Sequence, residues 1–123
     1  MQTVIEFAKK YWLAGAIGFC VFAFSVAGAL KLVGTRELHD AFALLGVPPW
    51  FGYFIGAAEV SGAIGLVIAK TRMPAALGLA IIMVGAVYFH AAHTSLPQTF
   101  PALVLLSLTL LIAVYTVKQK ART

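Results

Sequence analysis

Charged side chains are scarce in this chain, and acidic ones are the scarcest. Only 11% of the 123 residues are charged, whereas 62% are hydrophobic, and the mean hydropathy is +0.97. Soluble domains contain roughly 45 to 50% apolar residues, so this composition excludes a soluble globular domain and indicates a membrane protein. The chain is long enough for one domain, and we expect a single transmembrane domain over residues 1–123.

Cysteine is almost absent. A lone thiol, Cys20, excludes an intrachain disulfide and does not reveal the redox compartment. We interpret Cys20 as a small buried hydrophobic residue. The sequence also has no glycine-rich phosphate loop and no nucleophile triad. Whether the chain is an enzyme stays open, and a non-autonomous subunit of an enzyme is one option.

Four apolar runs are long enough to cross a bilayer, whose hydrocarbon core of about 30 Å needs about 20 helical residues. They cover residues 11–30, 50–69, 73–93 and 100–117. Pro74 and Pro101 stand near the starts of the last two runs, where a proline suits the first turn of a helix. We therefore predict an all-α integral membrane protein, an antiparallel four-helix bundle with tight turns at residues 70–72 and 94–98.

The net charge of +5 comes from nine Lys and Arg residues, which cluster at the ends of the apolar runs. This placement indicates topology determinants and not a nucleic-acid surface. Only Lys31 and Arg36 fall on one side of the predicted membrane. The other side carries Lys9, Lys10, Lys70, Arg72, Lys118, Lys120 and Arg122. Positively charged loops face the cytoplasm, so we predict that both termini are cytoplasmic.

The segment between the first two runs is the one long connection. Its apolar residues recur on one helical face and its charged residues on another: Leu38, Ala41, Phe42 and Leu45 against Arg36, Glu37 and Asp40. We predict a short amphipathic helix on the outer surface, which begins at Thr35 and ends at Gly46. A plain polar loop is the alternative.

Glu59 is the only acidic residue after Asp40, and it lies in the middle of the second run. Bilayer hydrocarbon penalises an ionised side chain by roughly 2.5 to 3.5 kcal/mol. Small residues, among them Gly56 and Ala63, share the helical face of Glu59 and would let a neighbouring helix approach closely. We expect Glu59 to point into the bundle, roughly 14 Å below the outer interface.

His90, near the outer end of the third run, suits proton exchange near neutral pH. Lys31, at the outer end of the first run, has a side chain long enough to reach into the bundle. We predict that Lys31, Glu59 and His90 form a polar cluster that carries the chemistry. The residues that we expect to bind a ligand are Tyr53, Gly56, Glu59, Met83, His90 and His93.

A purely structural interpretation of these residues stays open. Glu59 would then bond a neighbouring helix, Lys31 would anchor the interface, and both histidines would be hydrated residues at a helix end. Depth is the difficulty for a shared site, because Glu59 and His90 differ by about 8 Å along the membrane normal. A contact between them would need helix tilt or a bridging water.

A metal site is a weaker alternative. Glu59, His90 and His93 form the two-histidine, one-carboxylate set of non-haem iron, but their depths disagree. The two histidines follow each other on one helix, so they cannot hold a haem iron from opposite faces. We predict no metal site and no intrinsic cofactor.

Four segments, in this order and spacing, resemble the DoxX-like family of small membrane proteins. They are Gly28-Ala29-Leu30-Lys31-Leu32, Leu45-Gly46-Val47-Pro48-Pro49-Trp50, Ile55-Gly56-Ala57-Ala58-Glu59-Val60-Ser61-Gly62 and Gly85-Ala86-Val87-Tyr88-Phe89-His90. The resemblance implies a four-helix protein, chiefly bacterial, hence of the cytoplasmic (inner) membrane. Lys31, Glu59 and His90 match recurrent polar positions of the family.

The resemblance also implies possible functions. Members of the family include small subunits of quinone-linked oxidoreductases such as thiosulfate:quinone oxidoreductase, membrane redox-complex scaffolds and a receptor-assembly chaperone. Our leading hypothesis is a subunit of a membrane redox complex that binds a quinone or similar lipophilic molecule, with a protein partner supplying electrons. A non-catalytic scaffold is the alternative, and a small transporter or proton-coupled channel is the third. The glycine and alanine faces permit a homo-oligomer without requiring one.

Overall fold

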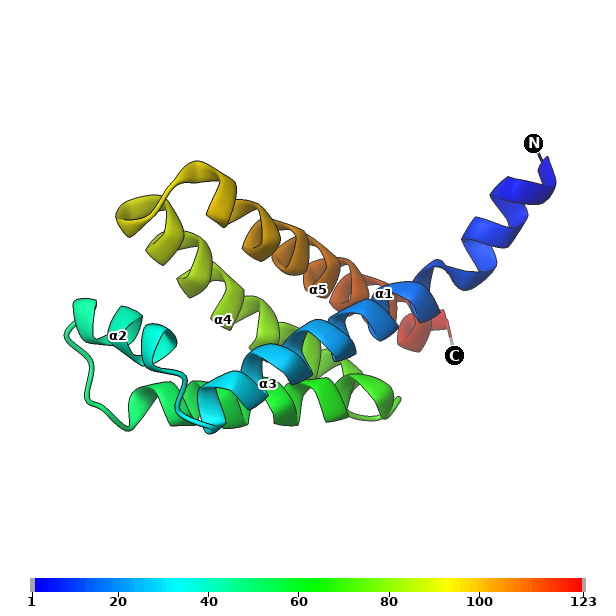
Figure 1. Ribbon diagram of the computed structural model, residues 1–123. Helices are drawn as coiled ribbons and strands as arrows, with labels where there is room; N and C mark the ends of the chain where they lie inside the picture. The colour runs from blue at the N-terminus through cyan, green and yellow to red at the C-terminus, as the bar shows by residue number, and fades with distance from the viewer. Residues whose placement is uncertain (1, 123) are drawn as a thin grey trace.

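The computed structural model describes residues 2–122 and is all-α over that range (Figure 1). Its helices are α1 (Gln2–Leu32), α2 (Arg36–Leu44), α3 (Phe51–Val67), α4 (Arg72–His93) and α5 (Leu96–Arg122). Three of them, α1, α4 and α5, are long and apolar enough to cross a membrane, and α3 is a shorter apolar helix of 17 residues. The chain is therefore a multi-pass membrane protein.

Two helices extend beyond the predicted spans. The first, α1, begins at Gln2, and its added residues are exposed. The last, α5, begins at Leu96, so the turn predicted over residues 94–98 contains only Thr94 and Ser95, and Pro101 lies inside the helix instead of in its first turn. Pro97 is the second residue of α5, where a missing N–H breaks no helical hydrogen bond.

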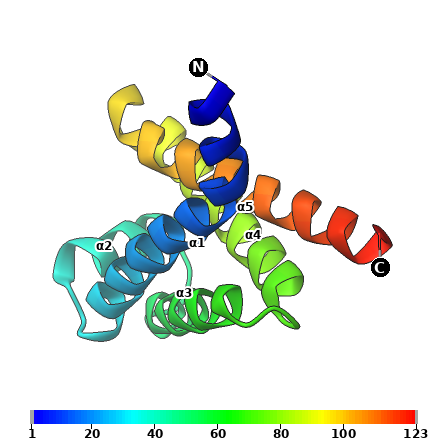
Figure 2. The same cartoon turned by 90° about the vertical axis from the view of Figure 1, so that its right-hand side faces the viewer.

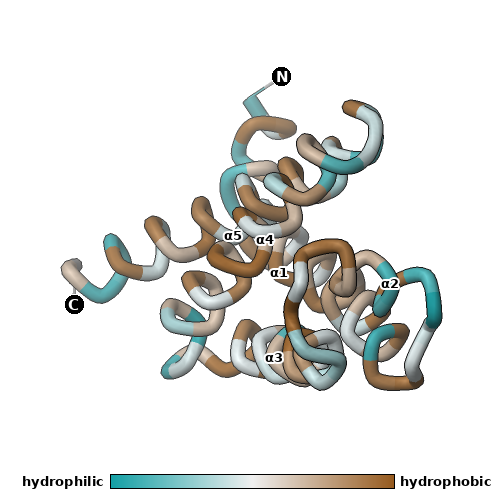
Figure 3. Tube along the Cα trace, turned by 90° about the vertical axis from the view of Figure 1, so that its left-hand side faces the viewer, coloured by the Kyte–Doolittle hydropathy of each residue, from teal (hydrophilic) through white to brown (hydrophobic). Residues whose placement is uncertain are grey.

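The four apolar helices form two antiparallel pairs, α1 with α3 and α4 with α5, and contact between α3 and α4 joins them. Both termini lie at one end of the molecule, and α2 and the α4–α5 turn lie at the opposite end (Figures 1 and 2). Hydrophilic residues gather on α2 and near the termini, whereas the spans are mostly apolar (Figure 3).

The core is made of small and aliphatic side chains with one aromatic ring, Phe24, which is fully buried. Cys20 is buried and free, as predicted. On α5, the buried Thr109 and Thr116 donate their hydroxyl hydrogens to carbonyls of their own helix, Thr116 to Ile112 O at 2.7 Å. No water is present in hydrocarbon, and such local bonds satisfy the hydroxyls there.

Glycines let α1 and α3 approach to backbone contact. A Cβ atom added at Gly28 would lie 2.7 Å from the carbonyl oxygen of Gly56 and 2.7 Å from Cγ2 of Val60. A Cβ added at Gly56 would lie 2.8 Å from the Cβ of Lys31. Gly56, one of the small residues on the face of Glu59, therefore faces α1, and Lys31 is held directly against α3.

The end of α3 is capped by side chains from the turn that follows. Arg72 Nε donates to Leu66 O at 2.7 Å and Nη2 to Val67 O at 3.3 Å. Thr71 Oγ1 donates to Gly65 O at 2.9 Å and lies 3.3 Å from Ile68 O. The last carbonyls of a helix have no partner within the helix, and these two side chains supply the missing donors.

The predicted amphipathic helix is present as α2, with Thr35 at its N-cap and Gly46 after its end in the left-handed region, at a φ of 74°. Its charged residues Arg36, Glu37 and Asp40 are exposed. Its apolar face turns inwards, and Phe42 packs edge-on against Phe51 of α3, with ring centroids 5.6 Å apart. Thus α2 covers one end of the helix pairs.

Candidate functional site

The charge of Glu59 is compensated by Lys31. Oε1 of Glu59, on α3, lies 2.7 Å from Nζ of Lys31, on α1, and the Glu59 side chain is 1% exposed. Lys31 is 14% exposed, so the pair is nearly removed from solvent. The contact of Gly28 with Gly56 brings the two backbones close enough for this short bridge. An ion pair in a low-dielectric interior is strong only when both charges stay in place.

The ion pair lies on the wall of a cavity of about 390 Å³. Residues of α2, α3 and α4 and of the α2–α3 loop form most of this wall, and Lys31 comes from α1. Besides Lys31, Glu59 and His90, the lining is almost wholly apolar and includes Leu38, Ala41, Phe42, Leu45, Val47, Phe51, Ile55, Ile82, Met83, Ala86 and Phe89. An apolar cavity of this size with a few polar groups is typical of small-molecule sites.

His90 is half-buried on the α4 wall, and Thr94 orients its ring. Thr94 Oγ1 donates to His90 O at 2.8 Å and lies 3.1 Å from His90 Nδ1. A hydroxyl has one hydrogen, and Thr94 uses it on the carbonyl. In the neutral ring, Nδ1–H therefore donates to Thr94, and Nε2 is left as the acceptor. This tautomer is assigned from the hydrogen-bond network.

The structure places Glu59 and His90 on the wall of one cavity. Helix α4 is inclined to α3 and diverges from it towards the end that carries α2 and the α4–α5 turn (Figure 1). The residue count from which we inferred a depth difference does not include this inclination. The two side chains therefore face a shared space.

The other predicted ligand-binding residues are divided. Met83 is buried and lines the cavity. Gly56 is buried at the α1–α3 contact and supports Lys31. Tyr53 is 46% exposed, and its ring lies against His39 with centroids 4.3 Å apart, in a separate hollow of about 240 Å³ beside α2. His93 is exposed next to Phe89.

Glu59, His90 and His93, the set considered above for iron, are thus not brought together. Among residues 2–122, no group of three or more His, Cys, Asp or Glu side chains is arranged to hold a metal ion.

The sequence analysis did not predict that α2 covers the cavity. His39 Nε2 lies 2.8 Å from the carbonyl oxygen of Lys31 and ties α2 to the end of α1. The apolar face of α2 was visible as a helical pattern, but we assigned it to the membrane surface. In the structure, Leu38 and Phe42 from this face line the cavity.

Comparison with known proteins gives one match. The model of a family described as the DoxX-like family matches residues 15–113, a range that contains Lys31, Glu59 and His90. The searches of curated proteins and of solved structures found no match for this chain.

Proposed function

We propose that this chain, which belongs to the DoxX-like family, is a membrane subunit that binds a quinone-like lipophilic molecule in the 390 Å³ cavity and exchanges protons with it. The main observation in support is that the Lys31–Glu59 ion pair and the imidazole of His90, which Thr94 orients, line the same apolar cavity. A protein partner in a membrane redox complex supplies the electrons.

The residues fit such a ligand. A quinone ring is flat and apolar at its faces and accepts hydrogen bonds at its two carbonyl oxygens. The rings of Phe42 and Phe51 and the side chain of Met83 line the cavity as apolar surface, and the ammonium of Lys31 provides hydrogen-bond donors beside it. A bound quinone supplies two-electron, two-proton chemistry, and the chain's own residues handle only the protons.

Each polar residue has its own part in proton exchange. Glu59, with a carboxylate in a dry environment, accepts a proton when Lys31 moves away and returns it when Lys31 comes back. His90 Nε2 accepts a proton, and Thr94 holds the ring in place from the other nitrogen. The apolar lining keeps bulk water out, which strengthens these electrostatic contacts.

The orientation of the protein belongs to the same proposal. Both termini lie at the end of the molecule that carries most of the positive charge, which supports a bacterial inner-membrane protein with cytoplasmic termini. The cavity then opens near the outer surface.

A titration of the purified full chain in nanodiscs with decylubiquinone tests the function. We expect saturable binding, and we expect Glu59→Gln and His90→Ala to raise the Kd about ten-fold, the value for one lost hydrogen bond to a charged group. Glu37→Gln and His93→Ala are matched controls, because both of these residues are exposed outside the cavity. The proposal fails if binding is not saturable, or if the cavity variants behave like the controls.

A scaffold is the second candidate, and the exposed charges of α2 favour it. Arg36, Glu37 and Asp40 project from the outer end of the molecule, where a protein partner can reach them. Reversal of the three charges should abolish co-purification of a partner and leave decylubiquinone binding unchanged. If this variant still co-purifies with the partner, α2 is not the element that binds it.

A further inference from the structure

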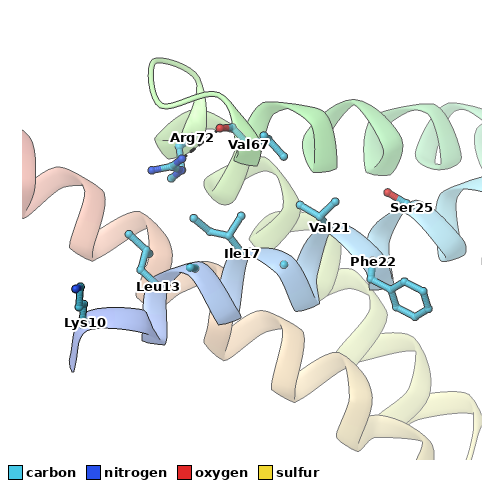
Figure 4. A pocket seen from close by; sticks show the side chains of 10 residues that line it. Lys10, Leu13, Ile17, Val21, Phe22, Ser25, Val67 and Arg72 are labelled. Carbon is cyan, nitrogen blue, oxygen red and sulfur yellow. Dashed lines mark hydrogen bonds between the residues drawn. The ribbon is translucent and has the colours of Figure 1, made fainter. Parts of the chain in front are cut away.

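At the end that carries the termini, a groove of about 800 Å³ lies between α1 and the end of α3 (Figure 4). Its floor and walls are mostly apolar or small and include Leu13, Ile17, Gly18, Val21 and Phe22 of α1 and Val67 of α3. Lys10 and Arg72 line the same groove, and Figure 4 shows both at one end of it, with Phe22 towards the other. The groove is thus cationic at one end and apolar along the rest.

The two cations are not neutralised within the groove. Among its described lining residues, none is acidic. Arg72 uses Nε and Nη2 to cap α3, and a guanidinium has five N–H donors, so it retains donors for an anion. Lys10 is exposed beside the ring of Tyr11. Both cations therefore keep donors that an anion from outside the protein can use.

The length of the groove matches one leaflet of a bilayer. Lys10 and Phe22 are twelve positions apart in α1, a rise of about 18 Å, and half of the hydrocarbon core is about 15 Å thick. Phe22 is 71% exposed and Val67 60% exposed, so both apolar side chains face outwards from the helix pair. A ligand with an anionic head and an apolar tail of one-leaflet length fits both properties.

We propose that this groove is a binding site for one anionic phospholipid, whose phosphate lies between Lys10 and Arg72 and whose acyl chain follows α1 to Phe22. Basic pockets between membrane helices bind such headgroups. The site is separate from the cavity that holds Glu59, and neither requires the other.

The cationic end of the groove can be tested by native mass spectrometry. The full chain is measured in detergent with added phosphatidylglycerol or phosphatidylcholine. Each cation near an anionic headgroup contributes about a five-fold change in affinity. We therefore expect wild type to prefer phosphatidylglycerol, and Lys10→Gln to lose about five-fold in affinity for it. Lys118→Gln, an equal change of charge outside the groove lining, should keep the wild-type affinity. Equal binding of the two lipids by wild type, or equal losses in the two variants, would overturn the site.

A second pair of variants tests the path of the acyl chain without altering charge. Gly15 and Gly18 both lie on α1 with nothing within 4 Å of an added Cβ, but only Gly18 lines the groove. Gly18→Leu should therefore weaken phosphatidylglycerol binding several-fold, while Gly15→Leu leaves it unchanged. Unchanged binding by Gly18→Leu would place the lipid elsewhere.

Discussion

The two antiparallel helix pairs are held together by different means. Across α1 and α3, glycine backbones touch and a lysine from one helix neutralises a glutamate of the other. Across α4 and α5, aliphatic and alanine side chains pack, and the buried hydroxyls of Thr109 and Thr116 bond only within α5. The first pair is joined by a polar contact between its two helices. In the second pair, these buried hydroxyls bond within one helix and do not join the two helices.

The two pairs therefore depend on their polar residues to different degrees. Lys31 and Glu59 neutralise each other in the α1–α3 pair. Removal of either charge would leave the other buried without a counter-ion, which is strongly destabilising. The α4–α5 pair has no such dependence, and among its described residues only those of α4 line the cavity, Met83, Phe89 and His90 included. Substitutions of polar residues should therefore lower the free energy of unfolding strongly in the first pair and only slightly in the second.

The largest expected effect is that of Glu59→Ala, which leaves Lys31 without its counter-ion. We expect the free energy of unfolding to fall by about 3 kcal/mol, measured by SDS titration of the purified protein. Glu37→Ala, at an exposed position, is the control and should change little. The double variant Lys31→Met with Glu59→Met should recover most of the loss. A single variant as stable as wild type would show that the pair is not closed in the folded state.

Gly28→Ala tests the backbone contact that supports the pair. The new methyl group would meet the Gly56 carbonyl at 2.7 Å, so we expect a loss of about 2 kcal/mol in the same titration. Gly15→Ala, in the same helix with open space around it, should cost nothing, because alanine favours helix more than glycine does. Equal behaviour of the two variants would mean that α1 and α3 do not approach so closely.

Thr94→Ala should weaken ligand binding without changing the stability of the fold. It removes the oxygen to which His90 Nδ1 donates, so we expect the Kd for decylubiquinone to rise about three-fold, the value of a modest neutral hydrogen bond. Thr94→Ser keeps the hydroxyl and should restore binding. If serine fails to rescue, the hydrogen bond is not what orients the ring.

The smallest effect belongs to Thr116→Val on α5. The lost hydroxyl bonds only Ile112 O of its own helix, so stability should change by no more than about 0.5 kcal/mol. Ile112→Ala, which opens a cavity at a fully buried site, should be clearly destabilising and shows that the assay detects this interface. A large loss from Thr116→Val would mean that α5, too, makes a polar contact across helices.

Much of the fold could be predicted because hydrocarbon leaves few choices. Apolar length located the spanning helices, helical spacing located α2, and the cost of a lone charge indicated a partner for Glu59. Lys31 and His90 were both candidate partners from the sequence, and the structure pairs Glu59 with Lys31. The place of Glu59 on a face of small residues was also visible in the sequence.

Other features depend on angles and contacts that no single segment encodes. The cavity that Glu59 and His90 both line is shaped by the inclination of α4 to α3 and by the position of α2, and neither follows from helix spacing along the chain. Tyr53 lies one turn from Gly56 on α3, but the ring of His39 holds it beside α2. The start of α5 at Leu96 was missed because Pro101 suggested a first turn, although a proline is tolerated inside a helix of this length.

The side-chain cap on α3 bears on the thickness of the membrane. With 17 residues, α3 is about 26 Å long, several ångströms less than the hydrocarbon core. Bare carbonyls at its end would need the headgroup water, and the bilayer would have to thin to provide it. Because Arg72 and Thr71 already serve those carbonyls, the end of α3 at the headgroup level does not require the bilayer to thin, and in a membrane thicker than α3 the opposite end, which α2 covers, lies below the surface.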